Sequence, residues 1–185
     1  MGSKLQKNLA SVNASCTRPT MSRVLKTAFD ILIHGCLKTH GAKPLEGLRT
    51  LDVFAGSGAF GFEALSRGSK AAAFIEKDPF NCKRIESIIQ NQNLQEKATL
   101  YPCDINDIPI IDTPFDILFL DPPYGLELMK TTLPYLYEKK WLHTKSWIIC
   151  ETEIKKDLGL PSIFTIKRIQ KIRGTQLSFV QLFDV

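Results

Sequence analysis

The sequence has 185 residues, a formal net charge of +5 at pH 7, 44% hydrophobic residues and 23% charged residues. This length suits one domain with a full core, and this composition excludes an intrinsically disordered chain. No apolar run is long enough to span a membrane, and the five cysteines form no C-x-x-C pair, so neither a zinc site nor a disulfide framework is expected. A cytoplasmic protein with reduced thiols fits this composition, and we expect a monomer.

The chain begins with a segment that shows no hydrophobic periodicity. Residues 1–17 are therefore expected to be flexible, and residues 18–185 are assigned to one folded domain. Apolar residues first recur at helical spacing over residues 18–37, which predicts a helix.

Strands and helices alternate from residue 48 onward. Strands are predicted at 48–56, 71–78, 98–105, 115–121 and 146–153, and helices at 59–68, 79–94 and 126–142. Pro134 is expected to bend or break the last helix. Residues 164–183 hold two β-rich stretches around Gly174, which predict an antiparallel hairpin. The fold class is therefore α/β: a single Rossmann-like, mostly parallel, seven-stranded sheet with helices on both faces and a C-terminal antiparallel hairpin.

A glycine-rich turn follows the first predicted strand. The stretch DVFAGSGAFG places Gly56, Gly58 and Gly61 in a G-x-G-x-x-G pattern, which alone is a weak signal. Glu76 follows the second strand about 20 residues after Gly56, where an acid typically binds a ribose diol. Asp52 lies four residues before Gly56 and would suit a methionyl ammonium, whereas it would repel a pyrophosphate. S-adenosylmethionine is thus favoured over a dinucleotide.

Asp104 and Ile105 follow the third strand. The acid can contact the exocyclic amine of adenine, and the isoleucine can pack on the ring. Acids at successive strand ends therefore predict an adenosyl ligand with a positive centre. The alternative is that Asp52 caps a helix, that Glu76 and Asp104 are solvated loop acids, and that the glycines only turn the chain.

The stretch FDILFLDPPY ends the fourth strand with an acid, two prolines and an aromatic residue. The Asp121 carboxylate and the Pro122 carbonyl can accept the N–H groups of an exocyclic amine, and Tyr124 can stack on the base. The prolines fix the backbone, which lowers the entropic cost of alignment. The base must be unpaired or extruded from its stack to reach such a site. Alternatively, the stretch is only a Pro-Pro turn with a tyrosine in the core.

Four stretches together resemble a known family: LDVFAGSGAFGFEALSRG, IEKD, FDILFLDPPY and RPTMSRV. They are similar to the bacterial 16S ribosomal RNA guanine-N2 methyltransferases of the RsmD type, from about Arg18 to the carboxyl terminus. The resemblance implies that residues 18–185 are a methyltransferase domain with S-adenosylmethionine as donor. It also implies a guanine N2 acceptor in 16S rRNA, within a partly assembled small-subunit particle. Family members usually begin with a short basic β segment, where this chain has KLQKNLASVNASC.

The resemblance also implies roles for individual residues. Asp121, Pro122 and Tyr124 would be catalytic, holding the target base for direct in-line transfer, with Asp121 orienting the amine rather than acting as a strong base. The residues expected to bind the cofactor are Asp52, Phe54, Gly56, Ser57, Gly58, Glu76, Lys77, Asp104 and Ile105. Arg18 and Thr20 would lie near the mouth of the site, and Pro123 is also expected to contact the substrate. Arg23 follows one helix face with Arg18 and Lys26, and these residues either contact phosphates or form a solvated surface. No metal site is expected.

Other functions remain open at this point. A DNA adenine-N6 or cytosine-N4 methyltransferase would share the D-P-P-Y sequence, but 185 residues leave no evident target-recognition domain. A non-catalytic nucleotide-binding or RNA-binding module is a third possibility, and a nicotinamide-dependent oxidoreductase fits less well. The basic residues of the predicted hairpin either contact phosphates or form a solvated surface; they are Lys167, Arg168, Lys171 and Arg173.

Overall fold

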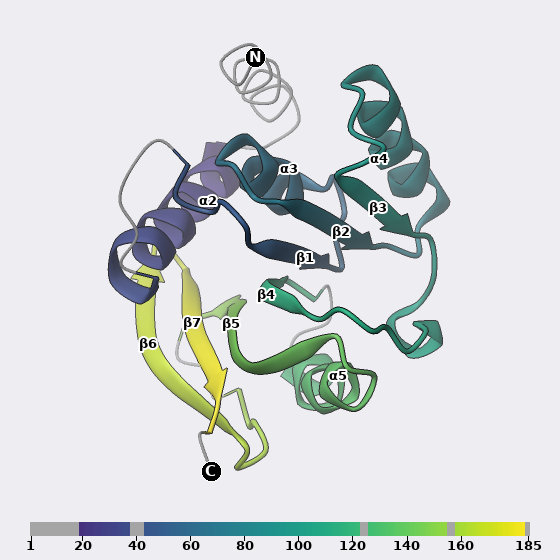
Figure 1. Cartoon of the computed structure of the whole chain (residues 1–185). Coiled ribbons are helices and arrows are strands. Elements are labelled where there is room, and N and C mark those ends of the chain that lie inside the picture. Colours follow the sequence, from purple (N-terminus) through teal and green to yellow (C-terminus); the bar gives the residue numbers. More distant parts are fainter. Residues whose placement is uncertain (1–18, 38–42, 123–125, 155–157, 184–185) are drawn as a thin grey trace.

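Seven strands form one sheet in the order β3-β2-β1-β4-β5-β7-β6 (Figure 1). The computed structural model describes residues 19–37, 43–122, 126–154 and 158–183. The strands are β1 (Arg49–Val53), β2 (Ala71–Ile75), β3 (Ala98–Tyr101), β4 (Phe115–Leu120), β5 (Leu142–Glu153), β6 (Phe164–Ile172) and β7 (Thr175–Leu182). Strands β1 to β5 pair in parallel, whereas β7 pairs antiparallel with both β5 and β6. The predicted Rossmann-like sheet with a terminal antiparallel hairpin is confirmed.

Helices cover both faces of the sheet (Figure 1). The helices are α2 (Pro19–Ile31), α3 (Ala59–Ser66), α4 (Pro79–Asn91) and α5 (Leu126–Glu138), with a π-helical turn η1 (Leu32–Cys36) and a 3-10 turn η2 (Ile105–Asp107). Buried side chains of α2, η1, α3 and α4 pack on one face, and those of α5 and η2 on the other. In the described part of the chain, no helix is long and apolar enough to cross a membrane.

Side chains alternate between the two faces along each strand. In β4, Phe119 packs in the core beneath α2 and α3, whereas Leu118 and Leu120 pack in the core beneath α5. Asp52 of β1 is in register with Phe119, so its side chain points toward α2 and α3 as well. Strand order reverses at the β1–β4 pair, which is where open α/β sheets bind ligands.

Most elements are a few residues shorter than predicted, and the region around α5 and the first helix differ most from the prediction. The helix that contains Pro134 is not broken there, because α5 runs from Leu126 to Glu138. It ends earlier than expected, and β5 already begins at Leu142. The helix predicted over residues 18–37 gives way to the π-helical turn at Leu32.

Candidate functional site

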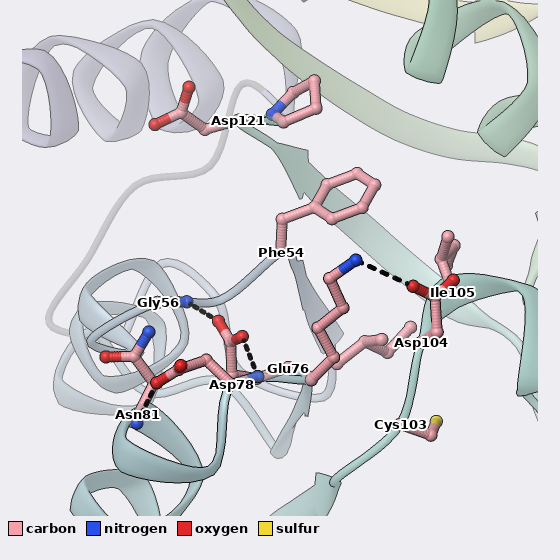
Figure 2. Close-up of a pocket in the computed structure, with 12 residues that line it drawn as sticks. Phe54, Gly56, Glu76, Asp78, Asn81, Cys103, Asp104, Ile105 and Asp121 are labelled. Carbon is pink, nitrogen blue, oxygen red and sulfur yellow. Dashed lines mark hydrogen bonds and ion pairs between the residues drawn. The ribbon is translucent and has the colours of Figure 1, made fainter. Parts of the chain in front are cut away.

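A cavity of about 630 Å³ lies where β1, β2 and β4 end, and Figure 2 shows the side chains around it. This volume is typical of small-molecule sites, which span roughly 300–1,000 Å³. The lining residues are Phe54, Gly56, Ile75, Glu76, Lys77, Asp78, Asn81, Cys103, Asp104, Ile105, Asp121 and Pro122. Because the carboxyl ends of parallel strands meet at one edge, residues far apart in the sequence converge here.

The turn after β1 forms one wall of this cavity. Phe54, Gly56 and Gly58 adopt positive φ angles of 61°, 54° and 74°. A positive φ is uncommon for a bulky residue such as Phe54 and marks a backbone held under strain by its surroundings. The ring of Phe54 lies in the middle of the lining side chains, between Asp121 and Ile105 (Figure 2). The turn thus presents an aromatic ring to the cavity as well as backbone.

Glu76, at the end of β2, is held by two backbone amides. The Gly56 N–H donates to its Oε2 at 2.6 Å, and the Asp78 N–H donates to its Oε1 at 2.8 Å (Figure 2). The first bond ties the glycine turn to β2, and the second sets the start of α4, where Asp78 caps the helix by accepting the Asn81 N–H. A carboxylate has about four acceptor sites, so Glu76 keeps capacity for two hydroxyl donors.

Asp104 forms the wall opposite the turn. Its Oδ2 accepts a hydrogen bond from Lys77 Nζ at 3.0 Å, and its Oδ1 accepts from the backbone and side-chain N–H groups of Asn106. These hydrogen bonds lower the pKa of Asp104, and the bond from the Asn106 backbone N–H has the largest effect. Lys77 is exposed, so the ion pair contributes little stability and can yield to another donor. The buried Ile105 adds an apolar surface beside this carboxylate.

Asp52 lies beneath the glycine turn with only 3% of its surface exposed. Its Oδ2 accepts the Gly61 N–H at 3.0 Å, in the first turn of α3. Burial raises its pKa to about 8, and the charges of Asp121 and Glu76 act in the same direction. This geometry supports the helix-cap alternative for Asp52, whereas its contact with a methionyl ammonium stays a prediction.

A smaller cavity of about 100 Å³ adjoins the first on the side of α2 and α3. Phe54, Gly56 and Asp121 line both cavities. The other residues of the smaller cavity are Leu25, Asp52, Ala55, Ser57, Ala59, Phe60, Phe119 and Glu151. Asp121 therefore stands at the junction, in contact with solvent, and partial burial of its carboxylate raises its pKa.

Most of the predicted site residues that the structure describes meet at these cavities. Gly58 does not line either one; its N–H donates to the Ala55 carbonyl, and a Cβ there would lie 2.8 Å from Phe62. Arg23 is exposed on α2 and lines neither cavity. Arg18, Pro123, Tyr124 and the Thr20 side chain lie outside the described residues.

Several residues that line the cavities were not predicted from the sequence. Asp78, Asn81 and Cys103 extend the first cavity, and Glu151 belongs to the second. Glu151 follows the buried residues 148–150 of β5 just as Glu76 and Asp121 follow the buried residues of β2 and β4, so the same strand-end rule could have found it. Among the described residues, no group of three or more His, Cys, Asp or Glu is placed to hold a metal ion.

Comparison with known proteins identifies the family of this chain. The sequence model of the family described as "Conserved hypothetical protein 95" matches residues 1–181. The chain belongs to this family. A relative, "Ribosomal RNA small subunit methyltransferase D" of Haemophilus influenzae, is 32% identical over 164 residues, covering 86% of this chain and 80% of its own. The resemblance to the RsmD family is therefore confirmed.

Solved structures show the same fold. A crystal structure from Haemophilus influenzae has a TM-score of 0.72 at 30% identity and covers 90% of this chain and 100% of its own. A structure from Escherichia coli has a TM-score of 0.74 at 25% identity, with coverage of 90% and 88%. The fold of this chain is therefore shared with these two solved structures.

Proposed function

We propose that this protein is a methyltransferase that uses S-adenosylmethionine to methylate the N2 amine of a guanine in 16S ribosomal RNA. The observation that carries the proposal is the position of Asp121, at the junction of a nucleotide-sized cavity and a smaller cavity beside it. The name of the Haemophilus influenzae relative supports ribosomal RNA of the small subunit as the substrate. The D-P-P-Y resemblance supports an exocyclic amine as the acceptor.

The larger cavity fits an adenosyl group. Glu76 has both oxygens fixed by backbone amides and directed so that ribose hydroxyls can donate to them. Ile105 and Phe54 offer apolar surface to a ring. Asp104 would accept the adenine amine when Lys77 releases its oxygen. These residues select a purine nucleoside by hydrogen bonds and packing, as small-molecule sites commonly do.

Asp121 would act on the acceptor amine. S-adenosylmethionine supplies a methyl group that is already electrophilic on its sulfonium, so alignment accounts for much of the acceleration. The Asp121 carboxylate would accept one amine N–H and thereby turn the nitrogen lone pair toward the methyl group. It would also stabilise the positive charge that develops on the nitrogen during transfer. As the C–N bond forms, the bond from sulfur to the methyl group would break and S-adenosylhomocysteine would leave. The amine proton becomes acidic only then and would pass to Asp121 or water, so a strong base is unnecessary.

Tritiated methyl transfer tests the proposal. Small-subunit particles, naked 16S RNA and DNA are offered in parallel, and the products are digested to nucleosides. We expect label in N2-methylguanosine from RNA, and we expect Asp121→Ala to lose transfer while its affinity for S-adenosylhomocysteine stays within about twofold. Glu96→Ala, which alters an exposed acid away from both cavities, is the matched control.

Each alternative function predicts a different result. Label in N6-methyladenine or N4-methylcytosine of DNA would identify a DNA methyltransferase instead. Binding of S-adenosylhomocysteine without transfer to any of the three acceptors would favour a non-catalytic binding module. Full transfer by Asp121→Ala would overturn the role given to this carboxylate.

A further inference from the structure

A second carboxylate stands beside Asp121 at this end of the sheet. Strands β4 and β5 pair in parallel, with Phe119 opposite Ile149 and Leu120 opposite Cys150. The same register carried one residue further places Asp121 opposite Glu151. Neighbouring strands lie about 4.8 Å apart, so the two residues are adjacent across the pair. Glu151 is two residues after Ile149, which packs beneath α2, and therefore points to that same face.

The surroundings of Glu151 fix one of its oxygens and leave the other for a ligand. Thr175 Oγ1, on β7, lies 3.1 Å from Glu151 Oε1 and 2.9 Å from the Thr152 carbonyl oxygen, so its one proton is shared between these two acceptors. Among the described residues, Oε2 has no hydrogen-bond partner, although the side chain is partly buried and lines the smaller cavity. Burial, with the Asp121 charge adding to it, raises the pKa of Glu151 to about 7. A ligand with N–H donors would give Oε2 a hydrogen-bond partner and would stabilise the charged form of Glu151.

The third acid at this cavity is already engaged. Asp52 accepts the Gly61 N–H from α3, which occupies the oxygen that faces the helix. Leu25, Phe60 and Phe119 supply the apolar part of the lining. A planar ligand edge that enters here therefore meets two acceptors side by side, Asp121 and Glu151, above an apolar surface.

Guanine presents the matching pattern. Its Watson–Crick edge carries the N1–H directly beside the N2 amine, so two neighbouring nitrogens both donate hydrogen bonds. Adenine and cytosine instead place a ring-nitrogen acceptor beside their exocyclic amine. Enzymes that act on an extruded base read it through hydrogen bonds to this edge.

We propose that Glu151 is the residue that selects guanine, accepting the N1–H of the target base while Asp121 accepts an N–H of its N2 amine. This inference rests on the proposed function and assigns it a specificity-determining residue. A site built to accept a substrate N–H rejects an analogue that lacks it, because a buried polar group is then left unpaired. Glu151 thus excludes bases whose amine is flanked by a ring acceptor.

An analogue that keeps the amine and lacks the N1–H tests this assignment. In 2-aminopurine the 2-amino group is present, but N1 is an acceptor. Small-subunit RNA is assembled with guanine or with 2-aminopurine at the methylated position, and single-turnover methyl transfer is measured for both. We expect the wild type to prefer guanine by about 100-fold or more. In Glu151→Gln the amide oxygen can keep the contact with Thr175 and turn the NH2 toward the base, which then meets no acceptor for its N1–H. Transfer to guanine should therefore slow by at least tenfold while transfer to 2-aminopurine is spared, so that the preference falls by the same factor.

Two controls separate specificity from structure and from donor binding. Glu153→Gln alters an exposed acid two residues further along β5 and should keep the full preference. The affinity of Glu151→Gln for S-adenosylhomocysteine should stay within about twofold. A preference unchanged in Glu151→Gln would overturn the assignment while leaving guanine methylation, and so the proposed function, intact. Weaker S-adenosylhomocysteine binding with an unchanged preference would likewise overturn it and assign Glu151 to the methionyl ammonium. Absence of guanine methylation by the wild type would overturn the proposed function itself.

Discussion

At the scale of single residues, Asp52 couples the stability of the fold to pH. Burial raises its pKa from 3.8 to about 8, so the folded state binds the proton more tightly than the unfolded state. The contribution of Asp52 to the free energy of unfolding is therefore fully present below about pH 4 and is lost as pH rises toward 8. Glu151, with its pKa raised to about 7, likewise contributes stability that is lost as pH rises, in this case toward 7.

Asp52→Asn should flatten this pH dependence. Asparagine keeps a carbonyl oxygen that can accept the Gly61 N–H, but it has no proton to lose. Between pH 5 and pH 8, we expect the wild type to lose on the order of 4 kcal/mol more than the variant in its free energy of unfolding. Urea unfolding at a series of pH values measures the difference. Parallel profiles for the two proteins would contradict it.

The sequence indicates where the site residues are but leaves some of their roles open. Acids at the ends of apolar strands were sufficient to locate Asp52, Glu76, Asp104 and Asp121. Whether Asp52 faces a ligand or caps a helix depends on how closely α3 approaches β1, and no local pattern encodes that approach. Glu151 gains its role from Thr175 of the terminal hairpin, a contact between segments that the sequence does not show to be neighbours.

At the scale of elements, the packing of α3 on β2 depends on Gly61. A Cβ at this position would lie 2.3 Å from the ring of Phe74, which is itself fully buried. We expect Gly61→Ala to lower the free energy of unfolding by about 1–3 kcal/mol, the usual cost of overpacking a filled core. Gly47→Ala, where a Cβ would meet nothing within 4 Å, is the comparison that reports backbone strain alone. A urea midpoint of Gly61→Ala equal to that of the wild type would show that Phe74 moves aside without cost.

Element bounds were predicted well where local signals are strong. Asp78 and Pro79 mark the start of α4, and the apolar run before Asp121 marks β4. The end of α5 was misplaced because Trp141 fits a helical pattern, whereas its Nε1–H bonds the distant Pro109 carbonyl and buries the ring after the helix has ended. Tertiary contacts of this kind override local periodicity.

At the scale of the whole molecule, basic residues of the outer strand β6 and its turn can attract RNA. Lys171 and Arg173 are exposed there, at the opposite end of the sheet from β3. Replacing both with alanine should weaken RNA binding about equally for all sequences and reduce the slope of log affinity against log salt by about two. Filter binding over a range of KCl measures both quantities, with Lys97→Ala next to β3 as the control. An unchanged slope would show that the hairpin is only a solvated surface.

The cavity spans the ends of strands that belong to one cooperative sheet, so a ligand bound there should stabilise the entire fold. A ligand that binds only the folded state adds about 2.7 kcal/mol at 100 times its Kd. For a chain of this size, that corresponds to a rise in Tm of about 5–10 °C. S-adenosylhomocysteine should therefore raise the Tm, whereas NAD should not, because the Asp121 carboxylate at the cavity makes it unfavourable for a pyrophosphate.

Glu76→Gln should reduce the rise in Tm that S-adenosylhomocysteine causes. The substitution should lower the Tm of the free protein by a smaller amount. A glutamine has one acceptor oxygen, so it cannot accept both the Gly56 and the Asp78 N–H and also bind a ribose hydroxyl. We expect the Kd for S-adenosylhomocysteine to rise by at least tenfold, measured by calorimetry on the folded variant at 25 °C. Glu96→Ala should match the wild type in both measurements. A Glu76→Gln variant that binds S-adenosylhomocysteine at wild-type affinity would show that the ribose lies elsewhere, and that Glu76 serves only to join the glycine turn to α4.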